Sequence, residues 1–290
     1  MGTVTDFSTL AGRPTKITAR GFGWTHAGRI QPALADIDLV IEPGERVLLC
    51  GDSGSGKSTF LAAIAGVLGS DEEGTRAGEI LLEDSTGAVE EPGQSIPVGL
   101  VLQDPDSQVI SARVGDDIAF GCENLAYPRE EIWRRVAAAK DLVGPFVDLD
   151  FPTERLSGGQ KQRLALAGVI AMGAGVVLLD EPTANLDPAG ARDVVRAVSA
   201  LVEETGATLV VVEHQHTAWE GLLDRAVELA QGRIVADGSF EQVATRRRVE
   251  GLPQARETGD GAAGEGDAAL WSKDLVTRFG PPRTISLPAG

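Results

Sequence analysis

Residues 45–68, ERVLLCGDSGSGKSTFLAAIAGVL, decide the fold of this 290-residue chain. The apolar run that ends at Cys50 predicts a buried strand, and apolar residues at helical spacing predict a helix from Lys57 to about Leu68. Between them, residues 51–58 read GDSGSGKS and fit the pattern GxxxxGK[ST] at every position. A strand, a glycine-rich loop and a helix in this order predict a phosphate-binding loop.

The chemistry of this loop predicts ATP and Mg²⁺ as its ligands. Glycines let backbone N–H groups turn inward around an anion, and the N-terminus of the following helix adds its positive dipole end. We expect Lys57 to reach the β- and γ-phosphates, Ser58 to ligate Mg²⁺ and Thr59 to reach the α-phosphate. A chance match in a glycine-rich chain is the alternative. The predicted ATP-binding residues of this segment are Gly51, Asp52, Ser53, Gly54, Ser55, Gly56, Lys57, Ser58 and Thr59.

A second apolar run, VVLL at residues 176–179, ends in Asp180 and Glu181. Paired acids at the end of a strand are often only exposed surface residues. Beside a phosphate loop, one carboxylate can hold Mg²⁺ through water, and the next can orient or deprotonate the attacking water. We therefore predict Asp180 as a metal ligand and Glu181 as the catalytic base.

The string Leu156-Ser157-Gly158-Gly159-Gln160 stands 20 residues ahead of that run and opens a predicted helix from Gly158 to Met172. Glycines at a helix N-terminus expose backbone N–H groups to an anion, as they do in the phosphate loop. A Ser-Gly-Gly sequence alone is a weak turn signal. Here the residues KQR follow at 161–163, and the strand with the two acids comes next, which makes the pattern specific.

This combination of motifs resembles the ATPase subunits of ABC (ATP-binding cassette) systems. The resemblance implies an α/β fold: a P-loop NTPase core with a RecA-like, mostly parallel sheet, an antiparallel β-subdomain and an inserted α-helical subdomain. It also implies that the LSGGQ string serves the ATP of a partner, a second ABC ATPase domain, fused or separate. The residues expected to make this contact in trans are Ser157, Gly158, Gly159 and Gln160.

Four single residues match further motifs of the family. Gln103 matches the Q-loop glutamine that contacts Mg²⁺, and His214 matches the switch histidine that hydrogen-bonds the γ-phosphate. Asp187 matches the D-loop aspartate, although it is also a good N-cap for a helix that starts at Pro188. Trp24 lies where an aromatic ring stacks on adenine, with Phe22 as the competing candidate. A surface glutamine and a structural histidine are the ordinary alternatives for Gln103 and His214.

The segment after Gln103 narrows the resemblance to energy-coupling factor (ECF) ATPases. Residues 103–108 read QDPDSQ, similar to the QNPDxQ segment of that group with Asp104 in place of the usual asparagine. Residues 114–121, 123–125, 128–132 and 161–168 continue the match. The resemblance implies an importer of a vitamin or a transition-metal ion. It also implies a transmembrane scaffold (T component) and a substrate-binding membrane subunit (S component) as partners, with the ATPase at the cytoplasmic face of the cell membrane.

Composition narrows the remaining classes. The formal net charge of -17 argues against a nucleic-acid partner, because affinity for phosphate backbones comes mainly from Lys and Arg. A soluble, non-transport ABC ATPase that acts on nucleic acid or ribosomes is the alternative function, and a P-loop kinase would lack LSGGQ. The two cysteines, Cys50 and Cys122, fit no metal or disulfide pattern, and Cys50 is expected in the core.

The remaining patterns divide the chain. Strand-like alternation covers residues 17–41, helices are expected over 128–143 and from 188 to about 204, and residues 208–212 predict a central parallel strand. We expect a loose tail over residues 1–14, the ABC domain over 15–250 and a flexible linker over 251–268. Residues 269–290 resemble the opening of the same domain, which predicts the truncated start of a second cassette. An unrelated tail is the alternative.

Overall fold

The computed structural model describes residues 10, 12–69, 73–144, 147–214 and 216–243. The chain divides into two units, Met1–Arg248 and Val249–Gly290, and every described residue belongs to the first. The predicted linker and the predicted start of a second cassette therefore lie outside the described residues.

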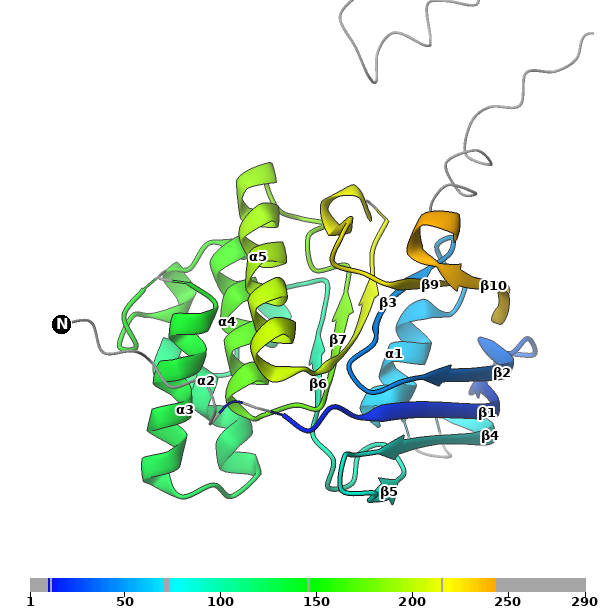
Figure 1. Ribbon diagram of the computed structural model, residues 1–290, viewed down its shortest axis with the longest axis horizontal. Coiled ribbons are helices and arrows are strands. Elements are labelled where there is room, and N and C mark those ends of the chain that lie inside the picture. The colour runs from blue at the N-terminus through cyan, green and yellow to red at the C-terminus, as the bar shows by residue number, and fades with distance from the viewer. Residues whose placement is uncertain (1–9, 11, 70–72, 145–146, 215, 244–290) are drawn as a thin grey trace, which may run out of the picture. The chain divides into compact units, whose positions relative to one another are not determined.

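A six-stranded sheet forms the centre of the domain (Figure 1). Its strands, in spatial order, are β10 (Arg233–Ser239), β9 (Arg225–Ala230), β3 (Arg46–Cys50), β8 (Thr208–Val212), β7 (Val176–Asp180) and β6 (Val98–Val101). The strands from β9 to β6 run parallel, and β10 pairs with β9 in the antiparallel sense. The prediction of a central parallel strand is confirmed, because all five residues of β8 are buried between β3 and β7.

A four-stranded antiparallel sheet packs beside this core. Its strands, in spatial order, are β2 (Leu34–Ile41), β1 (Lys16–His26), β4 (Gly74–Glu83) and β5 (Val89–Glu90). Helix α1 (Lys57–Ala65) contributes Phe60, Leu61 and Ile64 to one apolar core that it shares with both sheets. The helix ends at Ala65, earlier than the predicted Leu68, because Gly66 adopts a left-handed conformation with φ of 72°.

Helices cover the opposite face of the six-stranded sheet (Figure 1). They are α2 (Val114–Asn124), α3 (Arg129–Leu142), α4 (Gly158–Ala171) and α5 (Pro188–Thr205). Three short 3₁₀ segments lie in the connections: η2 (Asp106–Gln108) precedes α2, η3 (Thr153–Arg155) joins α3 to α4, and η4 (His216–Trp219) follows β8. Helices α2 and α3 lie between β6 and β7 in the chain and pack against α4, which confirms the predicted inserted helical subdomain.

The predicted loose tail over residues 1–14 is wrong at its C-terminal end, whereas residues 1–9 and 11 are outside the described part. Leu10 is fully buried in the core beneath the helices, and Arg13 pairs with Asp84 at 3.1 Å. The prediction that Cys50 lies in the core is confirmed; Cys122 is buried as well, and burial raises the pKa of its thiol to about 11. Of the helices described, none has both the length and the apolar character needed to span a bilayer.

Candidate functional site

The predicted catalytic residues gather at one edge of the six-stranded sheet. Strand β3 leads into the loop at residues 51–56, β7 ends at Asp180, and His214 follows β8 by two residues. Because these strands are parallel neighbours, their carboxyl ends meet at the same edge, where α/β sheets bind their ligands. Gln103 follows β6 at this edge as well.

The loop at residues 51–56 has a backbone shape that suits an anion and that requires glycine at two positions. Gly51 has φ of 143°, and a Cβ there would stand 2.2 Å from the carbonyl oxygen of Leu229. Gly56, with φ of 106°, is the residue before the first turn of α1, so the N–H groups of that turn face the loop. The hydroxyl of Ser55 is buried and has no hydrogen-bond partner among the described residues. A buried hydroxyl without a partner, next to a helix N-terminus, fits a bound phosphate.

Lys57 lies folded over this loop. Its Nζ donates hydrogen bonds to the carbonyl oxygens of Gly51 at 3.0 Å and Asp52 at 2.9 Å. The side chain is buried, so its ammonium is held at the mouth of the loop. A cation in this position can transfer its donors to phosphate oxygens without a change of backbone.

Ser58 and Asp180 bring the loop and the second apolar run together. The Ser58 hydroxyl hydrogen-bonds the Asp180 carboxylate. Burial raises the pKa of Asp180 above its ordinary value, whereas the bond from Ser58 and the charge of Lys57 oppose that rise. A hydroxyl and a carboxylate in contact are oxygen ligands of the kind that Mg²⁺ takes together with substrate phosphates, so these residues fit the predicted metal. Gln103 is exposed, and its predicted contact with the metal stays a prediction.

Glu181 and His214 form a pair. Nε2 of His214 lies 2.9 Å from Oε1 of Glu181. The carboxylate of Glu181 is largely buried, whereas the imidazole is 47% exposed and so is open to a ligand. Glu181 has φ of 48°, an uncommon conformation for a residue other than glycine, and its N–H donates to the carbonyl oxygen of Val212 at 2.9 Å.

The LSGGQ string begins α4 through a capping box. Ser157 Oγ accepts a hydrogen bond from the backbone N–H of Gln160 at 3.4 Å, and Gln160 Oε1 accepts one from the N–H of Ser157 at 2.9 Å. The Ser157 hydroxyl acts as an acceptor here, so its own hydrogen stays available to a ligand. Asp187 caps α5, since Oδ1 accepts from the N–H of Gly190 at 2.8 Å, which confirms the N-cap prediction.

A cavity of about 390 Å³ opens in front of this string. Its lining consists of Ser157, Gly158, Gly159, Gln160, Arg163, Asn185, Leu186, Asp187, Ala189, Gly190 and Asp193. Four of the five residues of the string, Ser157 to Gln160, thus share one cavity with Asp187. No residue of the loop at 51–58 lines it.

Comparisons with known proteins agree with these motifs. A family model described as ABC transporter matches residues 34–184. The energy-coupling factor transporter ATP-binding protein EcfA1 of Caldanaerobacter subterraneus subsp. tengcongensis is 38% identical over 235 residues, which are 78% of this chain and 82% of that protein. A putative ABC transporter ATP-binding protein of Methanosarcina acetivorans is 38% identical over 224 residues, 77% of this chain and 35% of that protein. The solved structure of CbiO1 from Clostridium perfringens, described as part of the ABC transporter complex CbiONQ, matches with a TM-score of 0.68 at 30% identity and covers 82% of this chain and 93% of that one.

The chain belongs to the ABC transporter family. The predicted fold class is confirmed, and so is the resemblance to ECF-type ATPases. The chain spans 35% and 39% of the length of its two Methanosarcina relatives. After the family motifs that they resemble, residues 51–58 are called below the Walker A loop, Asp180 and Glu181 the Walker B pair, and LSGGQ the signature.

The structure adds two residues to the site that sequence reasoning missed, Thr183 and Glu213. The Thr183 hydroxyl, two residues after the Walker B pair, donates to Oε2 of Glu213 at 2.6 Å. Glu213 is 4% exposed, and its Oε1 accepts from the backbone N–H of His214 at 3.0 Å. A carboxylate directly after an all-apolar strand and directly before the switch histidine was the available signal.

Trp24 does not present the open ring that adenine stacking requires. It is 4% exposed, and the alternative Phe22 is buried as well. The indole Nε1 donates to Nδ1 of His26 at 3.1 Å, and the ring packs so closely on β4 that a Cβ at Gly74 would stand 2.3 Å from Trp24 Cζ2. The rings of Trp24 and His26 meet edge to face. The observed place of Trp24 is therefore the core of the β-subdomain, and its contact with adenine stays a prediction.

The Q-loop is tied to the signature helix. Gln108 Oε1 accepts from the N–H of Leu102 at 2.8 Å, and its Nε2 donates back to the Leu102 carbonyl at 3.0 Å. From α4, the buried Gln162 donates to the same carbonyl at 3.1 Å. The backbone directly before Gln103 is thus held in part by α4. A shift of the Q-loop would therefore also displace the helix that carries the signature.

An apolar groove of about 450 Å³ lies beside the Q-loop. It runs between the end of β6, helix α2 and helix α4. The exposed apolar side chains along it are Leu102, Ile110, Phe120 and Leu125. Exposed apolar side chains gathered in one groove are typical of a surface that another chain covers.

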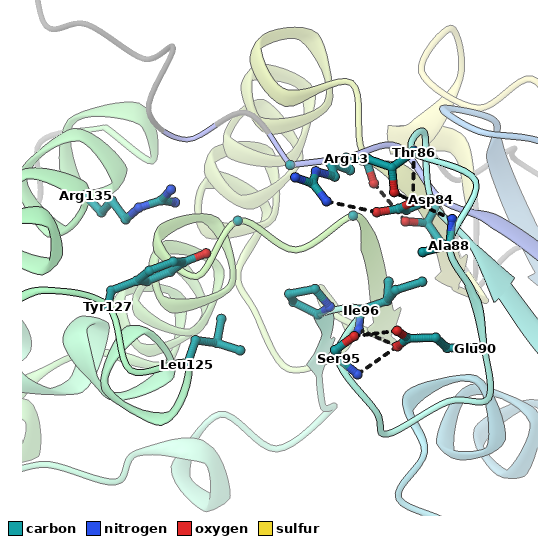
Figure 2. Close-up of a pocket in the computed structure, with 15 residues that line it drawn as sticks. Arg13, Asp84, Thr86, Ala88, Glu90, Ser95, Ile96, Leu125, Tyr127 and Arg135 are labelled. Atoms are coloured by element: carbon teal, nitrogen blue, oxygen red, sulfur yellow. Dashed lines mark hydrogen bonds and ion pairs between the residues drawn. The ribbon is translucent and has the colours of Figure 1, made fainter.

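A separate cavity of about 460 Å³ lies between the N-terminal segment, the β-subdomain and α3 (Figure 2). Arg13 on one side is bound to Asp84, and Arg135 on the other lies over the Tyr127 ring, 4.4 Å from its centroid. The Glu90 carboxylate accepts hydrogen bonds from Ser95. Each charged group of this cavity thus has a partner, which for Arg135 is Glu131 at 2.7 Å, and none of the predicted site residues lines it.

Proposed function

We propose that this chain is the ATP-binding and ATP-hydrolysing subunit of an ECF-type ABC importer, which powers uptake of a vitamin or a transition-metal ion through membrane partners. The observation that carries the proposal is the Glu181–His214 pair, 2.9 Å apart, at the sheet edge where the Walker A loop also begins. ECF transporter ATP-binding proteins among the relatives support the subtype.

In this proposal, ATP binds at the Walker A loop. The backbone N–H groups around Gly54 and Gly56 and the ammonium of Lys57 surround the β- and γ-phosphates, and the Ser55 hydroxyl gains the hydrogen-bond partner it lacks. Ser58 and Asp180, already in contact, would hold Mg²⁺ with Gln103. The bound metal would neutralise charge that develops on the phosphate oxygens.

In this proposal, the Glu181–His214 pair carries out hydrolysis. The Glu181 carboxylate orients the attacking water and accepts its proton as the bond to phosphorus forms. His214 then donates from its exposed imidazole to the γ-phosphate while Glu181 holds its ring in place. General-base catalysis of this kind contributes about 10²- to 10⁴-fold to a rate.

The signature cavity supports a second ABC ATPase domain as the partner. Ser157 Oγ–H and the N–H groups of Gly158 and Gly159 face a space that no residue of this chain's own Walker A loop lines. A phosphate bound there would come from an ATP held by the other cassette. Two cassettes would thus close on two ATP molecules, each contacted by the Walker A loop of one and the signature of the other.

The groove beside the Q-loop supports a membrane scaffold subunit, the T component, as the partner that connects ATP use to transport. An amphipathic helix of that subunit would place its apolar face against Phe120 and Ile110. Closure of the cassettes would move α4 and the Q-loop, and with them the scaffold and the S component that carries the cargo. The chain would accordingly sit at the cytoplasmic face of the membrane, held there by these subunits.

Replacement of the base tests the proposed function. In Glu181→Gln, which cannot accept a proton, we expect ATP hydrolysis by the full chain to fall by on the order of 10²- to 10⁴-fold, with ATP affinity retained. The exposed Glu204 of α5 offers the matched control, because Glu204→Gln makes the same chemical change outside the site. A Glu181→Gln variant that hydrolyses ATP at the wild-type rate would remove Glu181 from the proposed role.

A further inference from the structure

Glu213 is a buried carboxylate that joins two separate loops of the site. It follows the five buried residues of β8 and is itself 4% exposed. One oxygen accepts from the Thr183 hydroxyl, on the loop after the Walker B pair, and the other accepts from the backbone N–H of His214. Glu181 and His214 lie on these same two loops. One carboxylate thus holds together the two segments that carry the proposed catalytic pair.

We propose that Glu213 is a positioning residue that sets the contact between Glu181 and His214. The inference rests on the proposed function, because it concerns how that pair is held. The loop that bears Glu181 is anchored at two points: its own N–H bonds the Val212 carbonyl at 2.9 Å, and Thr183 bonds Glu213 at 2.6 Å. Both anchors lie on β8 and the residue after it, directly ahead of His214.

The backbone at Glu181 explains why two anchors are needed. With φ of 48°, Glu181 occupies a conformation that is sparsely populated for residues other than glycine. Such a conformation persists where the surrounding contacts impose it. Release of Thr183 would leave the Val212 bond as the remaining one of these two anchors and let Glu181 relax. The Nε2–Oε1 contact with His214 would then lengthen.

A carboxylate suits this position better than its amide. Burial of an unpaired charge is costly, but both oxygens of Glu213 receive a donor, and charge-assisted hydrogen bonds are stronger than neutral ones. In Glu213→Gln, the amide NH₂ cannot accept, so either Thr183 or the His214 N–H loses its acceptor.

The loop that Glu213 holds through Thr183 continues to the signature cavity. The carbonyl oxygen of Thr183 accepts from the N–H of Leu186 at 3.2 Å, and Leu186 lines that cavity beside Gly159. Glu213 is therefore linked to the hydrolysis pair on one side and to the cavity of the signature on the other. Occupation of the cavity by a partner's ATP would be transmitted along this path to Glu181.

Two substitutions of Thr183 separate the hydroxyl from the side-chain shape. Thr183→Val keeps the shape and removes the donor to Glu213, whereas Thr183→Ser keeps the donor. We expect kcat for ATP hydrolysis to fall about 10-fold or more in Thr183→Val and Glu213→Gln, with KM for ATP within about twofold of wild type. Thr183→Ser should stay within about twofold of wild type in both. A merely structural role would lower the melting temperature without this split between kcat and KM.

The imidazole of His214 gives a readout that does not depend on turnover. The chain has 3 histidines, so ¹⁵N-histidine spectra of the full chain can be assigned with His26→Gln and His216→Gln. Glu181→Gln supplies the spectrum of a disrupted pair. We expect the His214 ring signals of Thr183→Val and Glu213→Gln to move toward those of Glu181→Gln, and those of Thr183→Ser to match wild type.

The outcomes distinguish this inference from the proposed function. Wild-type kcat and wild-type His214 signals in both Thr183→Val and Glu213→Gln would overturn the positioning role, even if Glu181→Gln is inactive. Full hydrolysis by Glu181→Gln would instead overturn the proposed function. If one variant fails to fold, the other decides the question, because each weakens the link that Glu213 makes between the two loops.

Discussion

The two glycine-rich loops of this domain, residues 51–58 and 157–160, both open a helix, but their glycines are required for different reasons. In the Walker A loop, Gly51 and Gly56 have φ of 143° and 106°, and a Cβ on either would strike a backbone oxygen within 3 Å. In the signature, a Cβ on Gly158 or Gly159 would meet its nearest neighbour at 3.6 Å, an ordinary contact. The first loop needs glycine to fold, whereas the signature glycines leave room for something that approaches from outside.

In the proposed function, this difference corresponds to contacts with two different molecules of ATP. The Walker A loop is completed by its own chain, through Lys57, Ser58 and Asp180. The signature opens on a cavity lined by its own helix and by the segment around Asp187, and by no Walker A residue. The proposed function therefore gives one loop a nucleotide of its own, and it makes the other loop half of a site that a second cassette would complete.

Replacement of a glycine by alanine in the Walker A loop should have the largest effect on ATP affinity. In Gly51→Ala, the added Cβ would stand 2.2 Å from the Leu229 carbonyl at a φ that L-residues rarely adopt. We expect ATP affinity to fall by on the order of 100-fold or more, about 2.7 kcal/mol, with a lower melting temperature. Fluorescent-nucleotide titration measures the affinity. Wild-type affinity would show that the loop tolerates a side chain and would remove this half of the comparison.

The matched change in the signature should leave binding intact and reduce turnover. In Gly159→Ala, the methyl group fits beside Gly190 but occupies the cavity where a partner's phosphate would lie. We expect ATP affinity within about twofold of wild type and hydrolysis lower by about 10-fold. Nucleotide titration and phosphate release on one sample check both values. A fall in affinity equal to that of Gly51→Ala would contradict the division between the loops.

A change remote from both loops should leave them unaffected and alter only acid stability. Hydrogen bonds from Thr86, followed by those from Arg13 and Ala88, lower the pKa of Asp84 to about 2. Because this folded pKa lies below the ordinary value of 3.8, the carboxylate stabilises the fold above about pH 4 and loses that contribution as the pH falls toward 2.

Thermal unfolding of Asp84→Asn against wild type checks this expectation. The difference in melting temperature should be largest near neutral pH and should shrink below about pH 4. ATP affinity at neutral pH should be unchanged, because Asp84 lies outside both loops. A constant difference across this pH range would show that the charge of Asp84 contributes nothing.

The sequence predicts the parts of this molecule whose conformation is local. Asp187 before Pro188 predicts a helix start, and the structure shows the cap bond to Gly190. The run at residues 208–212, apolar after Thr208, predicts a buried central strand, and β8 is buried throughout. Helix α2 was not predicted as a separate element, since Gly115 and Gly121 weaken its helical pattern and its stability comes from packing against α4.

Contacts between distant segments were less predictable. Trp24 fits an adenine contact by position, but its burial depends on the close approach of Gly74, 50 residues away in the chain. Glu213 reads as an ordinary acid in sequence, and its bond to Thr183 appears only when β7 and β8 lie side by side. Position within a motif thus predicts which residues gather at the site, whereas the partners that hold them depend on the tertiary fold.

Hydrolysis measured against assembly state tests the central claim most directly. The specific ATPase rate of the full chain is recorded over a range of concentrations, and sedimentation with ATP reports the fraction paired at each one. If each signature serves the ATP of another cassette, the rate per chain rises with the paired fraction, and samples that are strictly monomeric bind ATP with negligible turnover. Robust hydrolysis by a strictly monomeric sample, at a rate independent of concentration, would contradict the account.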